Sequence, residues 1–401
     1  MPANLRTHSN PLAATSEQPV LYLALELGWD SWKLAFGRGP GPAPRRREMP
    51  ARDIDRLRQE IAEAKRRLRL PADCRVVSCY EAGRDGFWLH RCLASAGVQN
   101  LVVDSSSIEV NRRQRRAKSD RLDVEKLLSM LLRYVGGETR LWSVVQVPTP
   151  EEEQARQLHR ELLALQHEST EHTNRIKSLL ATCGLEIQVD RHLPKRLKEL
   201  RQWDGSPLAP ALHQRLLREF ERLQVVNRQV RQLEQQRART VRSEASPAAL
   251  QVRKLLGLRG IGLRSAWLYV HEFFGWRKFK NRRQVGSLAG LTPTPYASGQ
   301  TDHEQGISKA GNKRLRWMAV EIAWGWLRFQ PDSQLTRWFY ARFALGSSRQ
   351  RRIGIVALAR KLLVALWRYL ETGVPPADAE LSDWQPKTRI LTGDLQAAAV
   401  G

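Results

Sequence analysis

The sequence has few cysteines and no long apolar run. Only four of its 401 residues are cysteines, and they include neither a CxxC pair nor a neighbouring ladder of histidines. This pattern excludes the common zinc and disulfide frameworks, so we expect Cys74, Cys79, Cys92 and Cys183 to be reduced packing residues. No stretch approaches the roughly 20 apolar residues that cross a bilayer, and the N-terminus lacks the apolar core of a signal peptide. We therefore expect a cytoplasmic protein without a membrane segment.

Acidic residues are scarce relative to basic ones. The chain has 41 Asp and Glu against 66 Lys and Arg, a formal net charge of +25. A balance this basic predicts a polyanionic partner, most often a nucleic acid, with an anionic membrane surface as the alternative. The length predicts two or three domains rather than one core.

The first part of the chain alternates predicted strands and helices. A disordered lead-in is expected at 1–19. Strands are then expected at 20–28, 31–37, 74–81 and 98–106, and helices at 51–70 and 84–97. This alternation predicts an α/β domain over 20–147 with a largely buried sheet.

The character of the chain changes after Pro148. Two long helices are expected at 151–182 and 210–242, and the second carries apolar residues at three- and four-residue spacing. This spacing predicts a coiled-coil helical hairpin, so 148–249 is interpreted as an arm with a linker that can support oligomerisation. A compact, basic, helical domain is expected at 250–372, and a flexible tail at 373–401.

Four acids lie where predicted strands end or a predicted helix begins. Glu26 lies inside the first strand, Glu81 directly follows a buried strand, and Asp120 and Asp123 open an apolar-periodic run. Each has an ordinary alternative as a strand-end or helix-start residue, because the helix dipole favours Asp there. As a set they could meet at one edge of the sheet, where hard oxygen ligands suit Mg²⁺ or Mn²⁺. Asp30, in a predicted hairpin turn, is the alternative to Glu26.

A basic run precedes the last two acids. The segment NRRQRRAK has five Lys or Arg in eight residues and no acid, which suits contact with a phosphate backbone. These five residues are Arg112, Arg113, Arg115, Arg116 and Lys118.

The C-terminal domain has two further signals. Gly260-Ile261-Gly262, between two apolar helical runs, fits a helix-hairpin-helix turn that presents N–H groups to phosphate, although an ordinary turn fits equally. A long loop is expected at 288–316, in a region where Lys and Arg greatly outnumber acids. Ser298 lies in this loop without a GxSxG elbow or an evident histidine partner, so a turn serine is the simpler interpretation from the residues alone. Lys309, Lys313 and Arg314 are further candidate phosphate contacts. The tryptophans that follow are expected in the core of the closing helices rather than as base-stacking platforms: Trp317, Trp324, Trp326 and Trp338.

These motifs together resemble a known family. The acid in the first strand, YEAGRDG, AKSDRLDVEKL, the helical insertion and GIG…GLTP…SG…ISKAGNKRLR follow the order of the insertion sequence 110 family of DEDD-type transposases, also called bridge-RNA-guided recombinases. The resemblance covers about residues 20–345. Its first acid is normally Asp, whereas this chain has Glu26, which keeps the carboxylate but adds a methylene.

The resemblance implies a RuvC-like, RNase-H-related N-terminal domain and a small helical C-terminal transposase domain. It implies that Glu26, Glu81, Asp120 and Asp123 hold Mg²⁺ or Mn²⁺ and that Ser298 forms a transient phosphoserine link with DNA. A structured guide RNA and a homo-oligomer, dimer or tetramer, are the implied partners besides DNA, in a bacterial, nucleoid-associated setting. The alternatives are a metal-only nuclease that resembles a Holliday-junction resolvase and a nucleic-acid-binding derivative with a decayed site.

Overall fold

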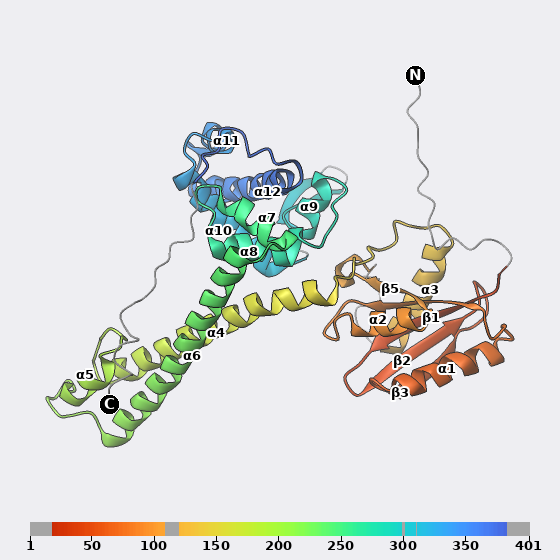
Figure 1. The fold of residues 1–401 in the computed structure, drawn as a ribbon, viewed down its shortest axis with the longest axis horizontal. Coiled ribbons are helices and arrows are strands. Elements are labelled where there is room, and N and C mark those ends of the chain that lie inside the picture. The colour runs from red at the N-terminus through yellow and green to blue at the C-terminus, as the bar shows by residue number, and fades with distance from the viewer. Residues whose placement is uncertain (1–17, 109–119, 299–300, 310, 383–401) are drawn as a thin grey trace. The chain divides into compact units, whose positions relative to one another are not determined.

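The computed structural model divides the chain into two units, Met1–Val147 and Pro148–Gly401 (Figure 1). It describes residues 18–108, 120–298, 301–309 and 311–382, without the side chains of 106, 120–123, 295–298 and 301–305. Within these ranges, no helix is both long and apolar enough to cross a membrane. The mixed α/β and helical class expected from the sequence is confirmed.

The first unit is built on one five-stranded sheet with the strand order β3-β2-β1-β4-β5. The strands β1, β2 and β3 are antiparallel neighbours, whereas β1, β4 and β5 run parallel. Their bounds are Val20–Leu27 for β1, Ser31–Gly37 for β2, Arg45–Pro50 for β3, Arg75–Glu81 for β4 and Gln99–Val103 for β5. The helical elements are α1 Ile54–Arg67, α2 Trp88–Ser95, the short η1 Ser105–Ser107 and α3 Asp120–Val135.

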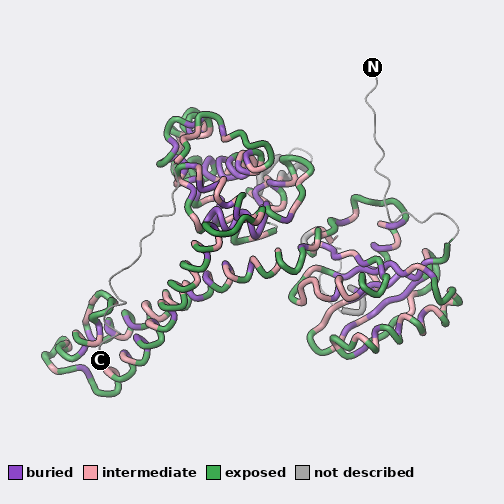
Figure 2. Tube along the Cα trace, viewed as in Figure 1, coloured by how far each residue is buried: buried purple, intermediate pink, exposed green. Residues whose placement is uncertain are grey.

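Helices cover both faces of this sheet, so its central strands are buried on both sides (Figure 2). Leu21, Leu23 and Leu25 of β1 pack with α1 and α2, whereas Tyr22 and Ala24 pack with α3. Side chains of a strand alternate between the two faces of the sheet. The two clusters therefore show toward which face the side chain of each later β1 residue points.

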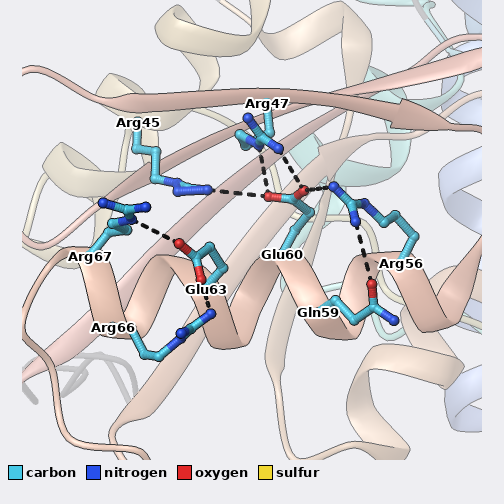
Figure 3. A network of polar contacts seen from close by, with 8 residues as sticks. All are labelled: Arg45, Arg47, Arg56, Gln59, Glu60, Glu63, Arg66 and Arg67. Atoms are coloured by element: carbon cyan, nitrogen blue, oxygen red, sulfur yellow. Dashed lines mark hydrogen bonds and ion pairs between the residues drawn. The ribbon is translucent and has the colours of Figure 1, made fainter.

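The edge strand β3, with three consecutive arginines, was not expected from the sequence. It is stabilised by Glu60 of α1, which is only 2% exposed. Arg47 donates two hydrogen bonds to Glu60, of 2.9 and 3.1 Å, and Arg56 donates one of 2.7 Å (Figure 3). Burial opposes ionisation of Glu60, but the hydrogen bond from Arg47 and the charges of Arg47, Arg56 and Arg45 outweigh it and lower its pKa.

We expect Glu60→Ala to lower the free energy of unfolding of the first unit by about 2–3 kcal/mol. Removing one partner of a buried ion pair leaves the other charges uncompensated, and the partial exposure of the arginines limits this cost. Because the folded-state pKa of Glu60 is lowered, its contribution is present above the unfolded pKa and is lost as pH falls through the folded value. Urea unfolding with hydrogen exchange of residues 45–67, at pH 7 and in acid, measures both effects.

Glu63→Ala is the matched control on the same helix. Glu63 pairs with Arg66 and Arg67 at the surface (Figure 3), where ion pairs stabilise little. Equal losses for both variants would show that burial of Glu60 is not what matters.

The second unit begins with an arm of two long antiparallel helices, α4 Pro150–Ala181 and α6 Pro210–Ser243, with α5 Leu193–Glu199 between them. The apolar stripe of α6 is buried at Leu216, Phe220, Leu223 and Val226, as the spacing predicts. Thr149 caps α4 through a reciprocal capping box with Glu152, which explains why the helix begins at Pro150.

The base of the arm is a buried polar cluster against the helical domain. Arg160 of α4 holds Glu272 in a two-bond ion pair of 2.8 and 3.1 Å. Glu272 lies in η3 Val270–Phe274, a π-helical turn, and is 2% exposed. His159 is fully buried beside them, and burial, together with the charge of Arg237, lowers its pKa to about 4. His159 is therefore neutral at pH 7, while the ion pair fixes α4 against η3.

The remaining elements form the compact helical domain. They are α7 Pro247–Leu256, α8 Leu263–Tyr269, α9 Arg282–Leu288, β6 Pro293–Ser298, β7 Thr301–Ile307, α10 Lys313–Phe329, α11 Gln334–Phe343 and α12 Ser348–Thr372. One continuous apolar core joins α7, α8, η3, α10 and α12.

Two expectations for this domain are wrong, and the predicted tail is described only in part. The segment 293–307 is a β-hairpin of β6 and β7 rather than a loop. Trp317 and Trp324, which were expected in the core, are 48% and 47% exposed. The buried face of α10 is the one that carries Trp326, and Trp317 and Trp324 lie outside it. The described part of the predicted flexible tail, up to residue 382, packs on the α7–α8 turn, where the N–H of Arg259 donates to the carbonyl of Glu380.

Candidate active site

The parallel pairing of β1 with β4 brings two of the predicted site residues together. Leu25 lies opposite Tyr80, and Glu26 and Glu81 are the next residues along each strand. Tyr22 and Ala24 of β1 and Val77 and Cys79 of β4 pack with α3, so strand alternation directs both glutamates toward the α3 face. Glu26 is half-buried and Glu81 is exposed.

The direction of α3 brings its first turn toward the same edge. Glu125 of α3 accepts a hydrogen bond from Arg46 of β3. Arg46 lies opposite Ala35 of β2, which in turn lies opposite Ala24 of β1. Leu128, one turn later, contacts Gly37, which lies opposite Tyr22. The helix therefore runs antiparallel to β1, and its first residue, Asp120, lies at the end of α3 nearer the carboxyl ends of β1 and β4.

Asp120 and Asp123 thus occupy the first helical turn near Glu26 and Glu81. Their side chains lie outside what the structure describes, and their role as ligands stays a prediction. The basic run with Arg112, Arg113, Arg115, Arg116 and Lys118 lies wholly outside the described residues.

A further carboxylate at this edge was missed by the sequence reasoning. Asp104 directly follows β5, the parallel neighbour of β4, and is half-buried. Its N–H donates to the Ser143 carbonyl at 2.9 Å, and its own carbonyl accepts from the Ser107 hydroxyl at 2.7 Å. An acid directly after a buried strand was the signal used for Glu81, and it also applied to Asp104.

Asp30, the alternative to Glu26, lies in the β1–β2 turn. It is exposed, and its carbonyl accepts from the N–H of Ala51 at 2.9 Å. Glu26 is the acid next to Glu81 on the paired strand, which favours it over Asp30 as a partner of Glu81.

The donor set at this edge fits a hard divalent cation. Carboxylate oxygens, such as those of Glu26 and Glu81, are the ligand type that Mg²⁺ and Mn²⁺ prefer. Among the side chains that the structure describes, no three acids, histidines or cysteines are grouped closely enough to hold a metal. A complete ligand set at this edge would therefore need the side chains of Asp120 and Asp123.

Ser298 belongs to the second unit, whereas the four acids belong to the first. It is the last residue of β6 and lies opposite Thr301, so it stands at the tip of the β6–β7 hairpin. A hairpin tip projects the residue beyond the packed core, which suits a group that must reach a substrate. Its side chain is not among those described.

The glycine turn between α7 and α8 is accounted for by packing. Gly260 has φ of +89°, and a Cβ there would come within 2.9 Å of Phe329. The N–H groups of Arg259 and Ile261 already bond to Glu380 and Leu258. Gly262 is the N-cap of α8 and is exposed. Two of the turn's N–H groups are thus unavailable to phosphate, and a phosphate role for Gly260 and Gly262 stays a prediction.

Exposed cations gather around the start of α10. Lys313 and Arg314 are exposed in its first turn, after the Asn312 cap, and Lys309 is exposed just before. Arg264 lies over the exposed ring of Trp317 at 5.5 Å. This surface combines positive charge with an aromatic face, the combination found where proteins bind nucleic acid.

Comparison with known proteins identifies the family. Residues 252–337 match the family described as Transposase IS116/IS110/IS902. The transposase candidate y4rJ of Sinorhizobium fredii is 41% identical over 384 residues, which cover 91% of this chain and 95% of the relative. A second candidate from the same organism, y4qE, is 28% identical over 73% of this chain and 74% of its own length. The transposase for insertion sequence element IS1328 of Yersinia enterocolitica is 26% identical over 55% of this chain and 64% of its own length.

The chain belongs to the IS116/IS110/IS902 family of transposases, as the 41% identity over nearly its whole length establishes. It is a DNA-binding enzyme of transposition, which cuts and rejoins DNA. The family resemblance drawn from the sequence motifs is confirmed at this level.

We expect Mn²⁺ to stabilise the protein through Glu26 and Glu81. At a metal concentration about a hundredfold above Kd, binding adds about 2.7 kcal/mol, which corresponds to about 5–10 °C in Tm. Glu26→Gln and Glu81→Gln should abolish this shift, whereas Asp30→Asn should retain it. Differential scanning fluorimetry with and without Mn²⁺ measures the shift and requires no DNA. Loss of the shift in Asp30→Asn alone would instead assign the first ligand to Asp30.

Proposed function

We propose that this transposase cuts and rejoins DNA with a divalent-metal site of RuvC-like type and a serine nucleophile acting together. The observation that carries the proposal is the side-by-side placement of Glu26 and Glu81 at the ends of parallel strands, with the first turn of α3 directed to the same edge. In this proposal Glu26, Glu81, Asp120 and Asp123 hold Mg²⁺ or Mn²⁺. When bound, the metal would polarise the scissile phosphate and stabilise charge on its oxygens.

Ser298 is the nucleophile in this proposal. Its Oγ attacks the phosphorus, a phosphoserine ester forms, and one deoxyribose oxygen leaves and takes up a proton. A deoxyribose hydroxyl of another strand then attacks the same phosphorus, and Ser298 leaves with its hydroxyl restored. The number of phosphoester bonds is unchanged over the two steps, so rejoining requires no external energy source.

The position of Ser298 in a different unit from the acids has a consequence for assembly. Both groups must meet one phosphate, within one chain or between two. The arm of α4 and α6 offers a long coiled surface for pairing copies, so we propose a homo-oligomer that shares its active sites.

We expect Ser298→Ala to eliminate a covalent protein–DNA adduct that the unmodified protein forms on a DNA substrate carrying its element's end. Without the hydroxyl no phosphoserine ester can form, so the adduct should fall at least about a thousandfold. Denaturing gel electrophoresis of labelled DNA after phenol extraction measures the adduct. Ser308→Ala, a change in the same hairpin region, is the control and should retain it.

A metal-only nuclease gives the opposite pattern. Cleavage would then persist in Ser298→Ala, no adduct would form with either protein, and the Ser298 role would be withdrawn.

A guide RNA is the second element of the proposal. Its support is the net charge of +25 together with the basic run at 111–118 and the exposed cations at Lys309, Lys313 and Arg314. Base pairing of such an RNA with DNA would supply the sequence recognition.

We expect a single discrete RNA to copurify when the chain is expressed with its native flanking DNA. Sequencing of the bound RNA after washing at high salt measures this, because non-specific electrostatic binding is released by salt. Heterogeneous host RNA that washes off would contradict a guide and leave only a polycationic protein.

A further inference from the structure

Trp29 is an exposed tryptophan near the end of the sheet that carries Glu26 and Glu81. Trp29 comes three residues after Glu26, and Arg84 comes three residues after Glu81. Because β1 and β4 are parallel neighbours, both residues leave the sheet at the same edge. Three residues reach at most about 10 Å, so the backbones of Trp29 and Arg84 lie within that distance of Glu26 and Glu81.

Two arginines lie over the ring of Trp29. The guanidinium carbons of Arg52 and Arg84 are 4.7 and 4.6 Å from the ring centroid. Despite these contacts Trp29 is 61% exposed. Burial in the core therefore does not account for this residue.

Arg52 links the backbone of Trp29 to Asp85. Its Nη1 donates to the Trp29 carbonyl at 3.0 Å and its Nη2 donates to Asp85 at 3.2 Å. Its backbone has φ of +67°, a conformation that a non-glycine residue retains only when its surroundings fix it. Such conformations gather at ligand-binding clamps, and here the strained residue ties the β1–β2 turn to the loop after β4.

The turn itself is built to present Trp29. A Cβ on Gly28 would come within 2.3 Å of the Ser31 carbonyl, so the chain can turn this tightly only with glycine. The Asp30 carbonyl is held by the Ala51 N–H. Hydrogen bonds to two successive carbonyls, those of Trp29 and Asp30, thus fix the backbone of the turn. The indole of Trp29 is therefore already positioned before a ligand binds.

Arg52 is exposed, with 42% of its side chain accessible, and Arg84 is exposed somewhat further. Its side chain is 55% exposed and lies 3.9 Å from Asp85, beyond hydrogen-bond distance. A phosphate can therefore compete with this long ion pair for the Arg84 donors, and both an indole and a guanidinium plane are surfaces on which a nucleobase stacks.

We propose that Trp29 and Arg84 form a nucleotide-binding site for unpaired DNA next to the scissile phosphate, with Arg52 and Asp85 as positioning residues. The base displaces the Arg84 guanidinium from the Trp29 ring and stacks in its place, and the displaced Arg84 binds a flanking phosphate. Strand cleavage and exchange expose unpaired bases, and such a base can reach an indole face that paired bases cannot. The inference rests on the proposed function for the location of the scissile phosphate, but the site binds DNA without catalysis.

The test is photocrosslinking of the full-length protein to a short single-stranded DNA that carries 5-iododeoxyuridine, in EDTA. Salt is raised until electrostatic binding by the basic chain is suppressed, because stacking is less salt-sensitive than phosphate contact. Mass spectrometry maps the crosslink, and fluorescence anisotropy gives Kd. We expect the crosslink at Trp29, and about five- to hundredfold weaker binding for Trp29→Ala.

Matched variants separate stacking from other effects. Trp29→Phe keeps an aromatic face and should lose clearly less affinity than Trp29→Ala. Arg84→Gln, measured before the salt is raised, should weaken binding by removing the phosphate contact. Trp203→Ala, at an 83% exposed tryptophan of the second unit, should bind as the unmodified protein does.

A Trp29→Ala protein that binds and crosslinks normally would overturn the proposal. Tighter binding of an RNA of the same sequence would overturn its assignment to DNA. Because EDTA removes metal and no cleavage is required, loss of the Ser298 adduct or of the Mn²⁺ effect would contradict the catalytic proposal and leave this one intact.

Discussion

The parallel pairing of β1 with β4 is the constraint on which the candidate active site depends. It places Glu26 and Glu81 one residue beyond the paired Leu25 and Tyr80, and alternation turns both toward the face that α3 covers. A shift of one residue in this register would send one glutamate to the opposite face, beneath α1 and α2. The same pairing brings Trp29 and Arg84 together three residues later. The sheet therefore sets both the carboxylates and the stacking residues beside them.

Arginine serves two purposes in this basic chain. Within the described residues, buried acids such as Glu60, Glu219 and Glu272 are each bound by arginines, which lowers their pKa and stabilises the fold. Other cations, such as Lys313 and Arg314, are exposed and available to phosphate. The positive charge is thus divided between ion pairs within the fold and exposed cations at the surface.

Much of the fold could be predicted from periodicity. Buried strands such as β1 and β4, and the long helices α4 and α6, have strong patterns that tertiary contacts reinforce. The edge strand β3 was missed because its three arginines look like a solvated charge run, and only Glu60 of α1 explains them. The β6–β7 hairpin was taken for a loop because Pro293 and Pro295 disfavour strands, yet a two-stranded hairpin tolerates proline. The prediction of Trp317 and Trp324 in the core is wrong because residue type alone does not show which face of a helix is buried.

The candidate site was predictable in part, since acids at strand ends are visible in the sequence, while Trp29 becomes notable only beside Arg52 and Arg84, which the fold brings to it. The most direct test is a crystal of the protein soaked in Mn²⁺, with an anomalous difference map. We predict a peak about 2.0–2.2 Å from carboxylate oxygens of Glu26 and Glu81, with Asp120 or Asp123 completing the ligands. Full Mn²⁺ occupancy elsewhere, with no peak between these two glutamates, would contradict a metal site at the ends of β1 and β4.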